Sequence, residues 1–374
     1  MINILKFLAK SNRVTVYCPQ YINRNIQKLP FDCISSLNIK NFNFPLTNAR
    51  RIYNDFRVYR FLKNEYKSGS FDVLQVENSL GALTLMSKSS FPKVGIFHGR
   101  ALKEISYSIR NQILLGKVKS CLALHFLKLY LNLSEKMLAR KSNRVIVTSE
   151  LVKEYAIELG SDANKIFVAS NGVDLKEYAK FSHSVSKYEL RKKIGIPQDA
   201  FVFVFHGSLE FDQNIEAIKN IIKIRNDLKN SKLDGKNRYF LIVGGPVERI
   251  KTLWKENRTK IDNVLFTGYV EDVKPYLFSA DCGIAPYPEH IEPGGPRIKI
   301  LEFLAARLPV ITTKKGISGI EELIYDQPIY LINENQHLKK LSLEQKVNIR
   351  KLEKFDWSKI AASNEKILKE TIKN

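Results

Sequence analysis

The amino-acid sequence predicts an α/β protein made of two lobes, each built on a parallel sheet covered by helices. Short apolar runs alternate with helical patterns in two successive series, as expected of βα repeats. The chain has 374 residues, which exceeds the roughly 100–200 residues of an ordinary domain. With 44% hydrophobic and 26% charged residues, the composition is that of a globular protein.

Each lobe is predicted from five apolar runs. Most of these runs end at Gly, Pro, Ser or Asn before a helical stretch, and several are rich in β-branched residues. The first series comprises residues 13–17, 72–76, 93–98, 144–148 and 165–169. The second comprises residues 201–205, 239–243, 264–266, 282–285 and 310–313.

Turn signals place the division between the lobes at residues 171–197. A turn reading Asn171-Gly172-Val173-Asp174 opens this stretch, and Ile196-Pro197 closes it before a fresh strand. We therefore expect an N-terminal domain of residues 1–170 and a C-terminal domain of residues 171–352. A final helix is expected over 353–374, where either Asp356 or Ser358 could cap it.

The charge of the chain favours an anionic partner. Lys and Arg number 60 against 38 acidic residues, a formal charge of +22, which suits phosphates, anionic lipid headgroups or nucleic acid. A Lys-rich coding bias on a solvated surface is the alternative. The four cysteines are far apart and form no C-x-x-C pair, which argues against a zinc site or disulfide scaffold and fits a reducing compartment.

Several common sites and segments are missing from the sequence. No D-x-D, no P-loop and no G-x-S-x-G motif occurs, so metal-diphosphate, P-loop and serine-hydrolase chemistry lack support. The N-terminus does not read as a signal peptide, and no apolar run approaches the roughly 20 residues that span a bilayer.

The strongest chemical signal is the segment Gly294-Gly295-Pro296-Arg297-Ile298-Lys299-Ile300-Leu301-Glu302. Glycines let backbone approach a phosphate, and Pro296 suits the first turn of a helix, whose free N–H groups attract anions. Arg297 and Lys299 add two cations, and Glu302 can accept hydrogen bonds from two ribose hydroxyls. We expect Ile298, Leu301 and Ala305 to face the core. The alternative is a capped amphipathic helix whose Lys299–Glu302 pair is a surface ion pair.

Two other strand ends offer candidate site residues. Gly207 and Ser208 follow the run 201–205 and precede a helical pattern, and open α/β sheets bind ligands at such turns. His98 ends the run 93–98 and is placed similarly. The alternatives are a glycine needed only for turn geometry and a histidine needed only for packing.

Taken together, these segments resemble the retaining glycosyltransferases of family 4. The matching segments follow the family order over nearly the whole chain: 71–77, Phe97-His98-Gly99, 134–149, 165–174, 263–270, 299–305, 309–312 and 355–358. The resemblance implies the α/β GT-B fold, with two Rossmann-like lobes whose parallel sheets face an interdomain cleft. It also implies that the helix of 353–374 crosses back to the N-terminal lobe.

The same resemblance implies roles for site residues. Those expected to bind the donor are Gly207, Ser208, Gly268, Val270, Gly294, Gly295, Arg297, Lys299 and Glu302, with His98 and Glu302 as catalytic residues and no metal. The family usually has a glutamate where Gly294 stands, and Arg and Lys where Ser208 and Gln213 stand. Both changes are shared by a branch reading G-x-L/M-x-x-x-x-N and G-G-x-R-x-K-x-x-E, which Gly207 through Asn214 and Gly294 through Glu302 match. We therefore infer that the phosphate-binding charge has moved to Arg297 and Lys299.

The N-terminus also departs from the family. Members begin with a strand and a glycine-rich loop, whereas residues 2–10 already read as the first helix, leading into the strand at 13–17. Either the gene starts upstream of Met1, or residues 1–8 form the strand. Without that strand, backbone groups in the middle of the sheet would be unpaired.

The resemblance implies transfer of a sugar from a nucleoside-diphosphate sugar to a hydroxyl acceptor with retention, in glycan, polysaccharide or glycolipid assembly. No cofactor beyond this substrate and no specific nucleic acid is expected. The acceptor would be a glycan or lipid-linked. The protein would be cytoplasmic, with the basic, apolar stretch 110–144 docking on the anionic inner face of the membrane or forming a core-packed helix pair. The alternatives are a sugar-nucleotide epimerase of the same fold and a non-catalytic polyanion-binding protein.

Overall fold

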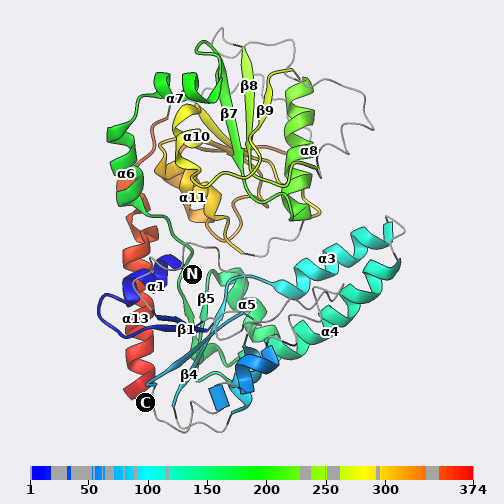
Figure 1. Ribbon diagram of the computed structural model, residues 1–374, viewed down its shortest axis with the longest axis vertical. Helices are drawn as coiled ribbons and strands as arrows, with labels where there is room; N and C mark the ends of the chain where they lie inside the picture. The colour runs from blue at the N-terminus through cyan, green and yellow to red at the C-terminus, as the bar shows by residue number, and fades with distance from the viewer. Residues whose placement is uncertain are drawn as a thin grey trace. The chain divides into compact units, whose positions relative to one another are not determined.

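The computed structural model describes most of the chain in two compact units. The described residues are 2–17, 32–34, 53, 55–60, 62–63, 71–78, 81–87, 91–114, 118–227, 237–248, 250, 262–291, 295–333 and 345–373. The N-terminal unit comprises Met1–Asn171, Gly294–Pro296 and Trp357–Asn374, and the C-terminal unit comprises Gly172–Pro293 and Arg297–Asp356. Each unit is an α/β structure with its own parallel sheet (Figure 1).

The C-terminal unit contains a six-stranded sheet of order β12-β11-β10-β7-β8-β9, in which every pairing is parallel. Its strands are β7 (Phe201–His206), β8 (Arg238–Val243), β9 (Val264–Phe266), β10 (Cys282–Ala285), β11 (Val310–Thr312) and β12 (Ile329–Leu331). Its α-helices are α6 (Leu175–Ser184), α7 (Lys187–Ile194), α8 (Asp212–Asp227), α10 (Lys274–Ser279), α11 (Ile298–Ala305) and α12 (Ile349–Leu352), with 3-10 turns η4 (Glu321–Tyr325) and η5 (Glu353–Phe355).

The N-terminal unit contains a four-stranded parallel sheet of order β3-β4-β5-β6 and a separate parallel pair, β1-β2. The strands are β1 (Thr15–Tyr17), β2 (Asp32–Ile34), β3 (Leu74–Glu77), β4 (Lys93–Phe97), β5 (Arg144–Val147) and β6 (Ile166–Val168). The helices are α1 (Ile2–Leu8), α3 (Ala101–Leu114), α4 (Val118–Lys141), α5 (Glu150–Glu158) and α13 (Trp357–Lys373), with 3-10 turns η2 (Ala82–Met86) and η3 (Ala163–Lys165).

The start of the chain forms the predicted helix. Ile4 and Leu8 lie four residues apart, so they share one helix face, and this face packs on Trp357 and Ile360 of α13. Figure 1 shows α1 beside α13. The alternative that residues 1–8 form a strand is therefore wrong, because their apolar side chains repeat with the helical period.

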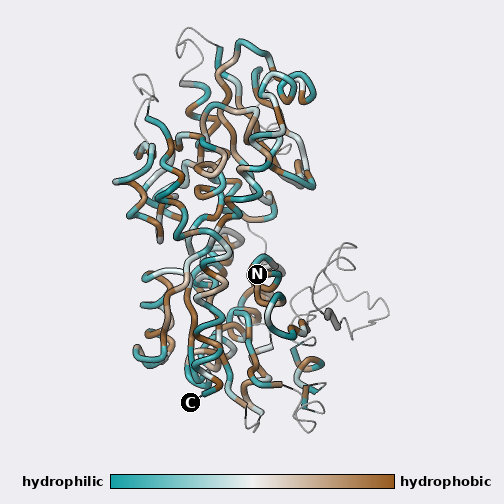
Figure 2. The backbone as a smooth tube through the Cα atoms, turned by 90° about the vertical axis from the view of Figure 1, so that its left-hand side faces the viewer, coloured by the Kyte–Doolittle hydropathy of each residue, from teal (hydrophilic) through white to brown (hydrophobic). Residues whose placement is uncertain are grey.

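The predicted fold class is confirmed. All ten predicted apolar runs overlap an observed strand, and both sheets are parallel. Two strands were missed, β2 and β12, which have only three residues each. In Figure 2 brown and teal alternate along the coiled segments of the tube, as expected of helices with one face toward the core.

Close packing of helix on sheet positions α11 in the C-terminal unit. Gly283 lies in β10, and a Cβ atom added there would come within 2.4 Å of the Phe303 ring. Phe303, Leu301 and Ile300 are fully buried in the core of this unit. The first turn of α11 is thereby held against the sheet. Among the described helices, none combines the length and apolar content that crossing a bilayer requires.

Candidate functional site

Three glycines bring the carboxyl ends of β7 and β8 into close contact with α11. At Gly244, whose φ is 137°, an added Cβ would lie 2.1 Å from the carbonyl oxygen of Gly207. At Gly207, whose φ is 152°, it would lie 2.8 Å from Lys299 Nζ. The Gly244 N–H donates to the carbonyl of Gly268, whose φ is 73°. The positive φ values at these three positions favour glycine, and the absence of a side chain at Gly244 lets the two turns pack backbone to backbone.

Arg297 is buried, and none of the described residues gives it a carboxylate partner. Its side chain is 9% exposed and its guanidinium carbon lies 4.3 Å from the centre of the Tyr287 ring. Nη1 donates to Gln213 Oε1 at 2.8 Å, while Nε and Nη2 find no hydrogen-bond partner in the described part of the chain. Buried donors of a charged group are costly when unsatisfied. The geometry therefore points to an anion as the missing partner.

Lys299 supplies a second buried cation on the same helix. Its Nζ donates to Asn214 Oδ1 at 3.1 Å and lies 3.9 Å from the centre of the Phe205 ring. Burial, together with the charge of Arg297, lowers the pKa of Lys299 well below its usual value. An anion bound beside both cations would oppose that shift.

Asn214 holds this arrangement together. Its Nδ2 donates to the Ser208 carbonyl at 2.7 Å, and its Oδ1 also accepts from the Tyr287 hydroxyl at 2.7 Å. One amide thus fixes the turn after β7, the aromatic ring beneath Arg297, and Lys299. Ser208 itself uses its Oγ to accept from the Glu210 N–H at 3.3 Å.

Glu302 lies one turn after Lys299 and remains a quarter exposed. Its Oε2 is 3.3 Å from His206 Nε2, without hydrogen-bond geometry. Burial raises the pKa of the Glu302 carboxyl, opposed chiefly by Lys299. Burial lowers the pKa of His206 to about 3, so its ring is neutral. The carboxylate is consequently not neutralised by the histidine and can accept hydrogen bonds from a ligand.

The start of α11 corrects two sequence-based expectations. The helix begins at Ile298 with Arg297 as its N-cap, so Pro296 precedes the helix instead of standing in its first turn. Ile298, expected in the core, is 39% exposed, whereas Leu301 and Ala305 are buried. The reason is that Lys299 takes the inward position, which also makes the surface ion-pair alternative wrong.

The remaining donor-binding candidates are distributed as follows. Gly294 lies outside the described residues. Gly295 is grouped with the N-terminal unit, where the adjacent Pro296 carbonyl accepts from Asn171 Nδ2 at 3.2 Å. Val270 follows Gly268 after β9 and is half-buried against the core of the C-terminal unit.

His98 stands at the carboxyl end of β4 in the N-terminal unit. Its Nε2 lies 2.6 Å from Oε2 of Glu77, which ends the neighbouring strand β3. Its backbone N–H donates to Asn78 Oδ1 at 2.8 Å. The imidazole is therefore held by a carboxylate, an arrangement that fixes ring orientation and tautomer.

Comparison with known proteins assigns both halves of the chain to one group of enzymes. The family described as Glycosyltransferase Family 4 matches residues 1–177, and that described as Glycosyl transferases group 1 matches residues 200–342. The chain belongs to the family 4, group 1 glycosyltransferases. It is accordingly a retaining transferase that uses a nucleotide sugar, so the matches do not support the epimerase and polyanion-binding alternatives.

Solved glycosyltransferases share the fold of this transferase. A glycosyltransferase from Rickettsia africae superposes with a TM-score of 0.65 at 16% identity, covering 100% of this chain and 94% of that one. Anabaena HepE in complex with UDP-glucose superposes with a TM-score of 0.68 at 16% identity, covering 99% of this chain and 94% of HepE. Sucrose-phosphate synthase from Thermosynechococcus elongatus superposes with a TM-score of 0.70 at 15% identity, covering 98% of this chain and 91% of the synthase. No curated protein matches the sequence significantly.

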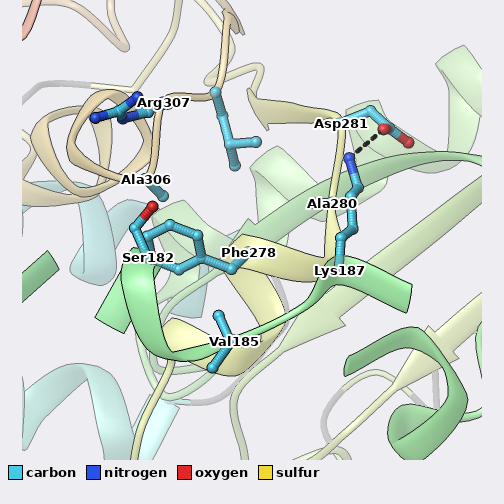
Figure 3. A pocket seen from close by; sticks show the side chains of 9 residues that line it. Ser182, Val185, Lys187, Phe278, Ala280, Asp281, Ala306 and Arg307 are labelled. Atoms are coloured by element: carbon cyan, nitrogen blue, oxygen red, sulfur yellow. Dashed lines mark hydrogen bonds and ion pairs between the residues drawn. The ribbon is translucent and has the colours of Figure 1, made fainter. Parts of the chain in front are cut away.

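A pocket of about 350 Å³ in the C-terminal unit is a weaker candidate for the transferase site (Figure 3). It includes Asp281, just before β10, and Leu308, just before β11, so it lies at the amino ends of these strands. Open α/β sheets bind ligands at the opposite ends. Its Lys187 is paired with Asp281 at 2.5 Å, as the dashed line shows. Over the described ranges, no group of His, Cys, Asp and Glu residues forms a metal-binding cluster.

The sequence analysis did not identify the side chains that contact the candidate site residues: Glu77, Gln213, Asn214, Tyr287 and His206. Gln213 and Asn214 were within the matched branch pattern, but nothing in their spacing pairs them with residues some 85 positions away. Glu77 ends a predicted strand next to that of His98, and this shared position was an available signal.

Proposed function

We propose that the C-terminal unit binds the diphosphate of a nucleoside-diphosphate sugar with Arg297 and Lys299. The observation that carries this proposal is the buried guanidinium of Arg297, whose Nε and Nη2 have no partner within the described ranges, beside a second buried cation. Arg can grip phosphate through two parallel hydrogen bonds. The burial of both cations also supports placing the chain in the branch that reads G-G-x-R-x-K-x-x-E.

The rest of the nucleotide would follow the carboxyl edge of the sheet. Glu302 would accept hydrogen bonds from the ribose hydroxyls, and the backbone near Gly268 and Val270 would lie by the base. Gly207 and Ser208 would line the phosphates, since a Cβ at Gly207 would lie 2.8 Å from Lys299 Nζ, one of the two proposed phosphate ligands. Gly294 and Gly295 remain proposed donor-binding residues on the sequence pattern alone.

In the proposed reaction, the bond between the anomeric carbon and the diphosphate oxygen breaks. The acceptor oxygen bonds to that carbon on the same face, and its proton passes to the departing phosphate oxygen. Arg297 and Lys299 stabilise the negative charge that develops on the diphosphate, which is the largest contribution such a site can make. His98, oriented by Glu77, would position the sugar or the acceptor.

Uridine diphosphate is the donor nucleotide that we propose first, since HepE binds UDP-glucose in its crystal structure. The proposed acceptor is a glycan or lipid-linked hydroxyl in glycan, polysaccharide or glycolipid assembly. The proposed location is cytoplasmic, on the anionic inner face of a membrane, which the excess of Lys and Arg supports.

A calorimetric screen of UDP, GDP and ADP, each with and without sugar, tests the donor site. We expect one of the three diphosphates to bind more tightly than its monophosphate. Arg297→Met should abolish this difference in affinity. Incubation of the labelled sugar nucleotide without acceptor provides the second test, because an epimerase would convert the sugar unaided. If none of the nucleotides binds, the proposal is overturned.

A further inference from the structure

Helix α4 has apolar side chains on two faces. One face packs on α3, where Leu127 and Leu131 are buried with Ile105 and Ile109. Figure 1 shows the two helices side by side. The second face bears four large side chains that are 57–65% exposed: Leu122, Phe126, Leu129 and Leu133. Their spacing of four, three and four residues aligns them in one stripe, here called the α4 stripe.

The charge around the α4 stripe is positive. The helix carries five Lys or Arg residues and one acidic residue, Glu135, which is buried. Lys128 is exposed next to Leu129. Lys136 follows Leu133 by three residues, so it continues the stripe toward the C-terminal end of the helix. Arg140 lies one turn further on, where its Nε donates to the Leu159 carbonyl at 3.1 Å.

We propose that the α4 stripe docks the N-terminal unit on an anionic membrane surface, with the helix lying in the plane of the interface. The four apolar side chains would enter the boundary between headgroups and acyl chains, and the neighbouring cations would contact anionic headgroups. The role of this docking rests on the proposed function, since a lipid-linked acceptor would reside at the membrane surface. Binding of the protein to the membrane requires neither donor nor acceptor.

Other occupants of the stripe fit less well. A second copy packed through the same face would bring the cations of two α4 helices together, with no exposed carboxylate on either helix to pair with them. A nucleic acid would satisfy the cations but would leave the four exposed apolar side chains in water. An anionic membrane satisfies both features of the face.

Co-sedimentation with vesicles tests the proposal. The full chain should pellet with an equal mixture of phosphatidylcholine and phosphatidylglycerol, and much less with phosphatidylcholine alone. The double variant Phe126→Ser, Leu129→Ser should lower partitioning about tenfold or more, because both side chains lose their transfer into the interface. Lys128→Glu should lower it several-fold, and added salt should weaken binding by the wild type.

Two matched substitutions in the N-terminal unit serve as controls. Ile157→Ser removes an exposed apolar side chain from α5, and Lys366→Glu reverses an exposed charge on α13. Both should partition as the wild type does. Because all substituted side chains are exposed, every variant should keep the circular dichroism spectrum and the unfolding midpoint of the wild type.

Three results would overturn the proposal: no pelleting of the wild type, equal pelleting of the double variant, or a wild-type dimer that the double variant dissociates. Salt-sensitive DNA binding that survives Phe126→Ser, Leu129→Ser, without vesicle binding, would assign the charge to nucleic acid instead. Measuring the UDP affinity of each variant by calorimetry tests the donor site independently of the membrane surface. If UDP binds while vesicles do not, the membrane surface alone is refuted.

Discussion

Replacing Arg297 by Met should weaken nucleotide binding while leaving the free energy of unfolding nearly unchanged. Two nitrogens, Nε and Nη2, have no hydrogen-bond partner among the described residues and are available to a diphosphate. A hydrogen bond to a charged group contributes about 1.5–3 kcal/mol, so losing two costs at least ~3 kcal/mol, roughly a hundredfold in Kd. In the unliganded protein the substitution loses the contact with Tyr287, about 0.5–2 kcal/mol, and the hydrogen bond to Gln213, about 1.5–3 kcal/mol. It also removes two buried nitrogens that have no partner among the described residues, at a cost of about 1–3 kcal/mol each, so the losses and gains are of similar size.

Arg191 provides the matched contrast, because it is equally buried but fully partnered. Its three nitrogens donate to the carbonyls of Ser279, Gln198 and Ala200 and to Asp281. Arg191→Met should lower the free energy of unfolding by about 3 kcal/mol or more and leave the UDP affinity of the folded protein unchanged. Calorimetry with UDP and urea unfolding measure both variants. If Arg297→Met instead lowers stability and binds UDP normally, the guanidinium has a structural role and the anion-site reasoning fails.

Three further substitutions test the remaining assignments. Glu302→Ala should weaken UDP about tenfold but leave calorimetric affinity for a dideoxyribose analogue unchanged; equal losses would contradict a ribose contact. Because the pKa of His206 is about 3 in the folded protein against an ordinary value of 6.5, the unfolded chain binds the extra proton between these values. Stability in urea should therefore rise across pH 3–6.5, by ~5 kcal/mol as an upper bound, and His206→Gln should flatten the rise. Glu77→Gln should lower kcat about tenfold at unchanged donor KM, and should have no further effect in a His98→Ala background; additive losses would refute positioning.

The strands were predictable because of how parallel sheets are buried. Strands covered by helices on both faces read as continuous apolar runs, as Phe201–His206 does, and such runs need no knowledge of the tertiary structure. β2 and β12 were not predicted, and their length does not explain this, because β1, β6, β9 and β11 also have three residues and were predicted. The order of the strands was available only through the family resemblance, since apolar content does not record which strands are neighbours.

The residue types of the proposed donor site were predictable, but their contacts were not. Arg297 and Lys299 were chosen for charge beside two glycines, and the structure shows both to be buried. Gln213 and Asn214, which accept hydrogen bonds from Arg297 and Lys299, follow β7 in the sequence. The pairing of β7 with β10 brings this part of the chain close to α11. The helix start was misplaced because Pro296 is compatible with a first turn, whereas the inward position of Lys299 is decided by the tertiary structure.

The ionisation states in the C-terminal unit argue that this corner is arranged for a ligand. Burial disfavours the charged forms of both Lys299 and Glu302, lowering the pKa of the amine and raising that of the carboxyl. Apolar side chains of similar size at these positions would give a fold of equal or higher stability, since replacing buried ionic groups in this way is often stabilising. The aromatic rings beneath Arg297 and Lys299 reduce the cost of holding two like charges together, but Nε and Nη2 of Arg297 still lack a hydrogen-bond partner in the part of the chain that the structure describes. A bound diphosphate would accept hydrogen bonds from those nitrogens and favour the charged form of Lys299. Part of the free energy that these buried groups cost the unliganded fold would therefore be recovered on binding.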